Sequence, residues 1–341
     1  MRAFITGLAG PALTAEERKF LKEAEPWGLI VFKRNVETPE ALRRLIGEFR
    51  SVVGWHAPVL IDQEGGRVQR LGPPHWPAYP PGAAYGALFD RDRDTGLAAA
   101  RLGARLIAAD LAELGIDVDC LPLADVPVSD ADPIIGDRAY GTEMGKVAAI
   151  AGEIAVGLME GGVLPVLKHI PGHGRATADS HERLPVVNAA RASLEATDFA
   201  AFRPLNHLPL GMTAHVVFTA FDPVAPATSS VTIVQDVIRD SIGFQGLLMS
   251  DDVSMGALSG SLGERTSAAI AAGCDMVLHC NGKMPEMRAV AAASPLLSGA
   301  AARRASAALA LRHLPSPIDL AASRAEFSNL MAGVPPAQGS A

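Results

Sequence analysis

The sequence predicts an α/β protein, namely a single-domain (β/α)8 barrel of the TIM type with extra C-terminal helices. Two observations predict this fold. Eight short apolar or β-rich runs recur along the 341 residues, and stretches with helical periodicity separate them. The helix-to-strand links are minimal, whereas several strand-to-helix links are long and rich in Pro and Gly. In such a barrel the long links gather at the carboxyl ends of the strands, where active sites lie.

The expected elements follow in order along the chain. We expect strands at residues 4–7, 28–32, 59–62, 116–119, 164–169, 212–217, 247–250 and 276–279. Apolar residues three or four positions apart predict helices between them, as in residues 42–52, 100–114 and 147–158. Thr14 with Glu17 forms a capping-box pattern, and Thr38 before Pro39 indicates another helix start. Helices are expected to end at Gly115, Gly161 and Gly273.

The chain is expected to end outside the barrel. After Leu311 the alternation stops, and the segment Pro315-Ser316-Pro317 precedes one more helical stretch. Residues 334–341 are rich in Pro, Gly and Ser, which is typical of a frayed end. We therefore expect one barrel domain over residues 1–333 and a flexible C-terminal tail over residues 334–341.

Composition excludes several classes of partner. Thirty Lys and Arg residues against 37 Asp and Glu residues give a net charge of −7 without a basic run, which argues against nucleic acid. No apolar stretch is long enough to cross a bilayer, and the N-terminus lacks the apolar region of a secretory signal. We expect a cytoplasmic protein. Cys120, Cys274 and Cys280 form no C-x-x-C pair, so we interpret them as small buried hydrophobic residues.

The third predicted strand ends in Asp62-Gln63-Glu64, and Arg67 and Arg70 follow. A carboxylate that accepts two hydroxyl protons, with an arginine fork beside it, suits vicinal sugar hydroxyls, and we assign this role to Asp62 and Arg70. For Glu64 and Arg67 we favour structural pairing or capping.

The fifth predicted strand ends in Lys168-His169, and His173, Asp179 and His181 follow closely. Two chemistries fit this cluster. One is a metal site; the other is a histidine acid/base oriented by an aspartate two positions away. Metal-dependent barrel hydrolases typically carry a His-x-His pair on their first strand, where this chain has Thr6-Gly7-Leu8, so the metal hypothesis ranks second. We expect His173 to support the loop.

The seventh predicted strand ends in Asp251-Asp252. Successive strand residues face opposite sides, so one carboxylate is expected in the barrel mouth and the other away from it. We interpret Asp252 as a helix N-cap and Asp251 as a nucleophile or electrostatic stabiliser.

Five segments together resemble glycoside hydrolase family 3, and within it the single-domain bacterial β-N-acetylhexosaminidases. They are LIDQEGGRVQRL (60–71), IGDR (135–138), KHIPGHGRATADSH (168–181), MTAH (212–215) and SDDVSM (250–255). They occur in the family's order from the third strand to the seventh. The segment at 168–181 is the most specific, since it distinguishes this subfamily from β-glucosidase relatives.

The resemblance implies retaining hydrolysis that releases terminal N-acetylglucosamine from β-linked sugars, here GlcNAc-anhydroMurNAc fragments of recycled peptidoglycan. Asp251 matches the nucleophile, which forms a covalent glycosyl-enzyme. His181 matches the proton donor and acceptor, and Asp179 its partner. The positions that hold the sugar correspond to Asp62, Arg70, Arg138, Lys168 and His169. No cofactor or metal is implied, and we expect a monomer.

Three alternatives remain open at this point. The strand-five histidines could serve a metal-assisted amidohydrolase. The barrel could bind sugar through Asp62, Arg70 and Lys168 without reacting. Phosphorolysis beside hydrolysis is a minor third, since a neutral histidine donor repels a phosphate acceptor less than a carboxylate would.

Overall fold

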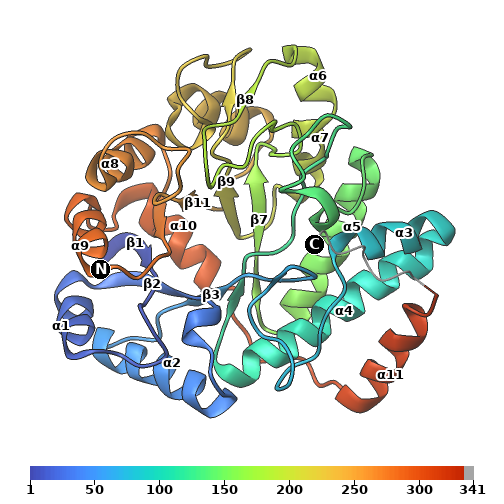
Figure 1. Ribbon diagram of the computed structural model, residues 1–341, viewed down its shortest axis with the longest axis horizontal. Coiled ribbons are helices and arrows are strands. Elements are labelled where there is room, and N and C mark those ends of the chain that lie inside the picture. Colours follow the sequence, from blue (N-terminus) through green and yellow to red (C-terminus); the bar gives the residue numbers. More distant parts are fainter. Residues whose placement is uncertain (334–341) are drawn as a thin grey trace.

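The computed structural model describes residues 1–333, in which eight parallel strands close into the predicted barrel (Figure 1). The predicted tail, residues 334–341, lies outside the described residues. Each strand pairs with its sequence neighbours in the barrel, and β12 closes onto β1 with Phe4 opposite Val277. In chain order the barrel strands are β1 (Arg2–Thr6), β2 (Pro26–Val31), β3 (Val59–Ile61), β6 (Val118–Asp119), β7 (Leu164–Ile170), β9 (Leu210–Thr213), β11 (Leu247–Asp252) and β12 (Met276–His279).

Helices surround the barrel (Figure 1). They are α1 (Ala15–Ala24), α2 (Pro39–Val53), α3 (Gly82–Arg91), α4 (Arg93–Leu114), α5 (Met144–Glu160), α6 (Arg191–Ala196), α7 (Asp198–Phe202), the π-helix η5 (Ile233–Ser241), α8 (Leu262–Ala272), α9 (Met284–Ala293), α10 (Gly299–Leu309) and α11 (Leu320–Leu330). The extra C-terminal helices are thus confirmed. Among the described residues no helix is long and apolar enough to cross a membrane.

Local sequence chemistry starts and ends these helices as predicted. Thr14 and Glu17 form a reciprocal capping box at α1, and the Thr38 hydroxyl accepts from the Ala41 N–H at the start of α2. Gly115 ends α4 with φ 82°, a left-handed conformation that glycine adopts without a steric penalty.

Strand side chains alternate between two cores. Ile5, Ile30 and Leu60 point into the barrel, whereas their neighbours in sequence pack under the surrounding helices. Ala305 and Ala308 of α10 belong to the interior core. Apolar side chains therefore fill the barrel, and the side chains of α10 pack against this interior core.

The connections between elements confirm the predicted asymmetry. The link from α5 to β7 is the residues 161–163, whereas 20 residues or more of non-barrel structure follow β3, β6 and β7. Two small sheets lie in these long links: β4 (Gln63–Gly65) pairs with β5 (Val68–Gln69), and β8 (Val186–Val187) pairs with β10 (Val217–Phe218). The sixth predicted strand is longer than observed, because β9 ends at Thr213. The Ala214 N–H still donates to the Ile170 carbonyl of β7, and residues 215 and 216 lie buried outside the barrel strands.

Candidate active site

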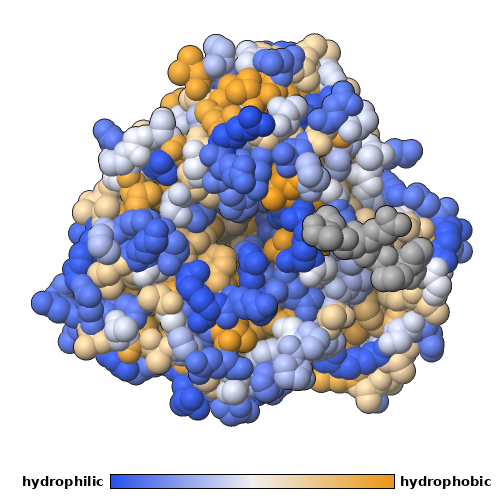
Figure 2. Space-filling model, viewed as in Figure 1, coloured by the Kyte–Doolittle hydropathy of each residue, from blue (hydrophilic) through white to orange (hydrophobic). Residues whose placement is uncertain are grey.

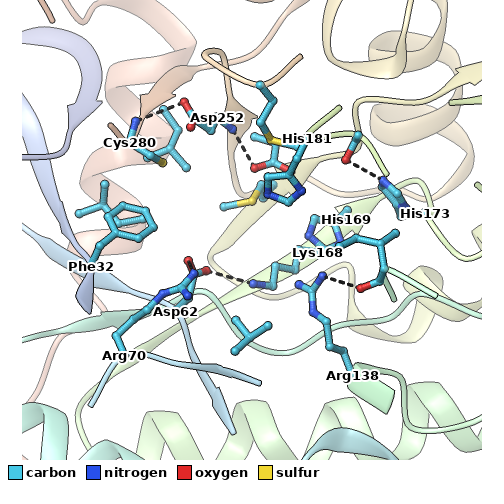
Figure 3. A pocket seen from close by; sticks show the side chains of 18 of the residues that line it. Phe32, Asp62, Arg70, Arg138, Lys168, His169, His173, His181, Asp252 and Cys280 are labelled. Atoms are coloured by element: carbon cyan, nitrogen blue, oxygen red, sulfur yellow. Dashed lines mark hydrogen bonds and ion pairs between the residues drawn. The ribbon is translucent and has the colours of Figure 1, made fainter. Parts of the chain in front are cut away.

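A cavity of about 480 Å³ opens at the carboxyl ends of the strands. Figure 2 shows a hollow near the centre of the molecule with hydrophilic side chains around it. All eight predicted site residues except Asp179 line this cavity. Phe32 and Cys280 lie on one side of it, and His169 and His173 lie on the other (Figure 3). The residues predicted from the sequence therefore gather at one pocket, although they are far apart in the chain.

A buried charge cluster forms the floor of the cavity. Lys168 is 2% exposed, and its Nζ lies 2.6 Å from Glu64 Oε1 and 3.2 Å from Asp62 Oδ1. The Arg138 guanidinium binds both Glu64 oxygens, at 2.8 and 2.9 Å. Arg70 donates to Asp62 Oδ2 at 2.8 Å, which confirms the predicted pairing of these two residues. Three cations and two carboxylates thus hold one another in a fixed array of donors and acceptors.

Opposite charges in this cluster offset the effect of burial on the pKa of each group. Burial alone would raise the pKa of each carboxyl, but Arg138 and Lys168 lower the pKa of Glu64 to about 2, and Lys168 and Arg70 hold that of Asp62 well below its ordinary value. Burial would lower the pKa of Lys168, but Glu64 and Asp62 raise it. Both carboxylates and the ammonium are therefore charged at neutral pH, and such an array suits a neutral, hydroxyl-rich ligand.

Strand β7 supplies both Lys168 and His169 to the cavity. Its interior residues are Leu164 and Val166, so Lys168 continues the inward series. The pairing register with β9 shifts between Leu167 and Ile170, and this irregularity brings His169 to the cavity as well. His169 Nδ1 lies 2.7 Å from Oδ2 of the fully buried Asp125.

The two adjacent aspartates at the end of β11 have different environments. Leu247 and Met249 point into the barrel, so Asp251 continues the inward series. Its Oδ1 accepts only the next backbone N–H, at 2.7 Å, among the hydrogen bonds of the described residues. Burial would raise the pKa of Asp251, but the imidazoles of His215 and His169, the Asp252 N–H and Lys168 hold it below its ordinary value. The Asp251 carboxylate is therefore ionised and faces the cavity.

The prediction that Asp252 caps a helix is wrong. Helix α8 begins ten residues later, and Ser261 caps it. Asp252 Oδ1 instead accepts from the N–H groups of Ser254, at 3.0 Å, and Cys280, at 3.2 Å, and its Oδ2 accepts from the Ser254 hydroxyl. The residue closes a turn and ties β11 to the end of β12. Contrary to the expectation that it faces away, Asp252 also lines the cavity, but these three hydrogen bonds hold its carboxylate.

His181 lies at the rim of the cavity on the long link after β7 (Figure 3). Its Nδ1 lies 2.7 Å from Asp179 Oδ1, which confirms that these two residues pair. His181 is 63% exposed and Asp179 is 27% exposed. Although burial would raise it, the pKa of Asp179 is lowered by its hydrogen bonds from the His181 backbone and side chain. The Asp179 carboxylate accepts a hydrogen bond from Nδ1–H of His181, so Nε2 is the ring atom that can exchange a proton with a ligand.

The other two histidines of this segment, His169 and His173, lie in edge-to-face contact with ring centroids 5.7 Å apart. His173 is 3% exposed, its Nε2 lies 3.1 Å from Ser180 Oγ, and burial next to His169 lowers its pKa to about 4. It therefore supports the loop that carries His181, as expected. Within residues 1–333 no three His, Cys, Asp or Glu side chains form a metal-binding group.

Some residues of the site were not found from the sequence. Asp125 stands alone in the apolar run 121–126, and a single carboxylate in such a run is a signal of a buried functional group. Glu64 and Arg67 do pair structurally, with Arg138 and with Asp137, but Glu64 also lies in the charge cluster under the cavity.

The three cysteines are free, and Cys280 is only half-buried because it lines the cavity.

Comparison with known proteins identifies the family. The model of the glycosyl hydrolase family 3 N terminal domain matches residues 4–306. The β-hexosaminidase of Alkalilimnicola ehrlichii is 39% identical over 281 residues, which cover 81% of this chain and 79% of the relative. That of Chromobacterium violaceum is 38% identical over 278 residues, which cover 80% and 77%.

Solved structures agree with this assignment. NagZ from Neisseria gonorrhoeae, in complex with N-trifluoroacetyl-D-glucosamine, superposes with a TM-score of 0.84 at 29% identity over 97% of this chain and 98% of that one. A glycoside hydrolase family 3 β-N-acetylglucosaminidase from Paenibacillus sp. str. FPU-7 gives a TM-score of 0.80 at 28% identity over 99% of this chain and 63% of that one. The chain therefore belongs to glycosyl hydrolase family 3.

Proposed function

We propose that this glycoside hydrolase, a β-N-acetylhexosaminidase by family and by its curated relatives, is a retaining exo-β-N-acetylglucosaminidase. Its proposed substrates are GlcNAc-anhydroMurNAc fragments, and its proposed role is peptidoglycan recycling in the cytoplasm as a monomer. One observation carries the mechanism: Asp251, whose carboxylate accepts only the next backbone N–H among the described residues, lines the same cavity as His181 of the Asp179–His181 pair, whereas the carboxylate of Asp252 is held by Ser254 and Cys280.

In the first step Asp251 attacks the anomeric carbon while His181 Nε2 gives its proton to the glycosidic oxygen, and the aglycone leaves. In the second step His181 takes a proton from water, and the resulting hydroxide displaces Asp251 from the sugar. Asp179 stabilises the imidazolium state of His181 and fixes its tautomer. The rule that relates carboxylate separation to stereochemistry does not apply, because the proton donor here is a histidine.

The floor of the cavity suits the sugar to be released. Asp62 offers acceptors and Arg70, Arg138 and Lys168 offer donors to sugar hydroxyl and amide groups, and His169 lies beside them. We assign Asp62, Arg70, Arg138, Lys168 and His169 to sugar binding.

The rim of the cavity supports an acidic aglycone. The Arg34 guanidinium lines it and donates to the carbonyl oxygens of Leu8 and Cys280, and it forms no ion pair with a carboxylate of residues 1–333. A positive rim favours the lactyl carboxylate of a peptide-free anhydroMurNAc, or the peptide carboxylates of one that carries a stem peptide, over a neutral chitin disaccharide. Hydrolysis of GlcNAc-anhydroMurNAc with a higher kcat/KM than N,N′-diacetylchitobiose is expected, and the reverse order would contradict the substrate assignment.

Site variants test the two catalytic roles. Asp251→Ala is expected to lower kcat on an aryl N-acetyl-β-glucosaminide by at least about 10³-fold, whereas its neighbour Asp252→Asn, the matched control, keeps most turnover. His181→Ala is expected to harm substrates with poor leaving groups most, since they need the proton. Full activity of Asp251→Ala or His181→Ala would refute the corresponding role.

A further inference from the structure

A second Asp–His pair besides Asp179–His181 presents its histidine to the cavity. His169 Nδ1 lies 2.7 Å from Asp125 Oδ2, the same separation as in the first pair. The two pairs differ in burial: Asp125 is 0% and His169 8% exposed, against 27% for Asp179 and 63% for His181. A buried, water-excluded carboxylate fixes an imidazole more firmly than an exposed one does.

Asp125 reaches His169 because the chain after β6 runs along β7. The Lys168 N–H donates to the Pro122 carbonyl at 3.0 Å, and the Ala124 N–H donates to the Lys168 carbonyl at 2.7 Å. This ladder places Asp125 beside the end of β7. Its second oxygen, Oδ1, accepts from the His173 N–H at 2.6 Å, at the start of the link that carries His181.

The pairing determines how His169 faces the cavity. Burial would raise the pKa of Asp125, but His169 and the other contacts of the carboxylate lower it, so Asp125 is ionised and only accepts. Nδ1 of His169 therefore carries a hydrogen. In the neutral imidazole the lone pair then lies on Nε2, which has no hydrogen-bond partner among residues 1–333.

We propose that Asp125 is a positioning residue that presents Nε2 of His169 to the cavity as a hydrogen-bond acceptor for one hydroxyl of the bound sugar. Through the His173 N–H the same carboxylate anchors the root of the His181 loop. This inference rests on the proposed function, because it names what one of the proposed sugar-binding residues does. Lys168, Arg70 and Arg138 supply donors on the floor, and His169 adds an acceptor for a donated hydroxyl proton.

The test is the variant Asp125→Asn. The amide nitrogen placed at Oδ2 would donate to Nδ1 of His169, so the ring hydrogen would move to Nε2 and the acceptor would become a donor. We expect KM for an aryl N-acetyl-β-glucosaminide to rise roughly 10- to 100-fold, with an unchanged dependence on the leaving group. Asp179→Asn makes the same change in the other pair and serves as the matched control. In that variant we expect the rate to depend more steeply on the leaving-group pKa, because His181 protonates the leaving group.

Deoxygenated substrates give a readout that a merely structural role would not move. For one of the 3-, 4- and 6-deoxy analogues, wild-type enzyme is expected to show a lower kcat/KM than for the parent substrate. On that same analogue Asp125→Asn is expected to show no further loss of kcat/KM, because the variant already lacks the hydrogen bond to that hydroxyl. If Asp125→Asn lost the same factor on every analogue as wild type does, the proposal would be overturned.

Nitrogen-15 NMR of histidine-labelled wild-type enzyme decides the tautomer without any variant or turnover. We expect the hydrogen of the neutral His169 ring to lie on Nδ1, and the Nε2 signal to shift on titration with GlcNAc. A protonated Nε2 in the neutral ring overturns the inference. Absence of turnover on every β-N-acetylglucosaminide would instead refute the proposed function, so the two failures are distinguishable.

Discussion

The His181 loop docks on the segment that follows the proposed nucleophile, and Gly256 makes this docking possible. The Gly256 N–H donates to the His181 carbonyl at 3.0 Å, and the Ala257 N–H donates to the Ser180 carbonyl at 3.1 Å. A Cβ added at Gly256 would lie 2.7 Å from the carbonyl oxygens of both His181 and Glu182. Gly256→Ala therefore forces the loop outward and breaks both hydrogen bonds.

The expected size of the effect follows from those two bonds. At roughly 1 kcal/mol each, their loss costs about 2 kcal/mol of docking free energy, which lowers the equilibrium constant for loop docking about 30-fold and the docked fraction by at most that factor. His181 acts only when docked, so the loss should fall on the protonation step. We expect kcat/KM to drop by up to this factor on alkyl or disaccharide substrates and much less on a nitrophenyl glycoside, which needs no proton.

The assay is kcat/KM across glycosides of graded leaving-group pKa. Gly47→Ala is the control, because an added Cβ there has no neighbour within 4 Å and the residue lies in the middle of helix α2. If Gly256→Ala and Gly47→Ala gave the same dependence on the leaving group as wild type, the reasoning about loop docking would be refuted.

Two further predictions concern acid stability and metal. Glu64→Gln should be less stable than wild type at pH 7, because Arg138 and Lys168 lose a buried, charged partner. The difference in unfolding free energy between wild type and variant should shrink by about 3 kcal/mol as pH falls from 4.5 to 2. The reason is that the stability contributed by the lowered pKa of Glu64 is fully present only above this range and is lost as the carboxylate takes up a proton. Denaturant unfolding across pH measures this, and a gap independent of pH would contradict it. Chelators should leave turnover unchanged, because His169 and His181 each bind an aspartate of their own, and loss of activity restored by a divalent metal would revive the amidohydrolase hypothesis.

Much of the fold and some contacts of the site could be predicted because they depend on local rules. Strand period and helix period are written in adjacent residues, so the eight strands and the caps at Thr14 and Thr38 follow from the sequence. The inward direction expected for one aspartate of the Asp251-Asp252 pair follows from the same period of two that places Met249 in the barrel core.

The errors arose where one local pattern fits two structures. An aspartate followed two residues later by a hydroxyl residue suits a helix N-cap and a tight turn equally, and Asp252 makes the turn. The apolar run at 212–217 is buried throughout, and burial alone does not distinguish a strand from the irregular segment that leaves β9.

The Asp125–His169 contact could not be predicted because the two residues are 44 positions apart and meet only through the path of the chain after β6. No periodicity spans such a contact. The irregular register at the end of β7, which brings His169 beside Lys168, is likewise a product of tertiary pairing rather than of local sequence.

Trapping the glycosyl-enzyme tests the central claim most directly. A slow fluorinated N-acetylglucosaminide should label the protein covalently, and peptide mapping should place the label on Asp251 of the segment SDDVSM. Label on Asp252 or on any other residue, or turnover with inversion and no covalent adduct, would contradict the account.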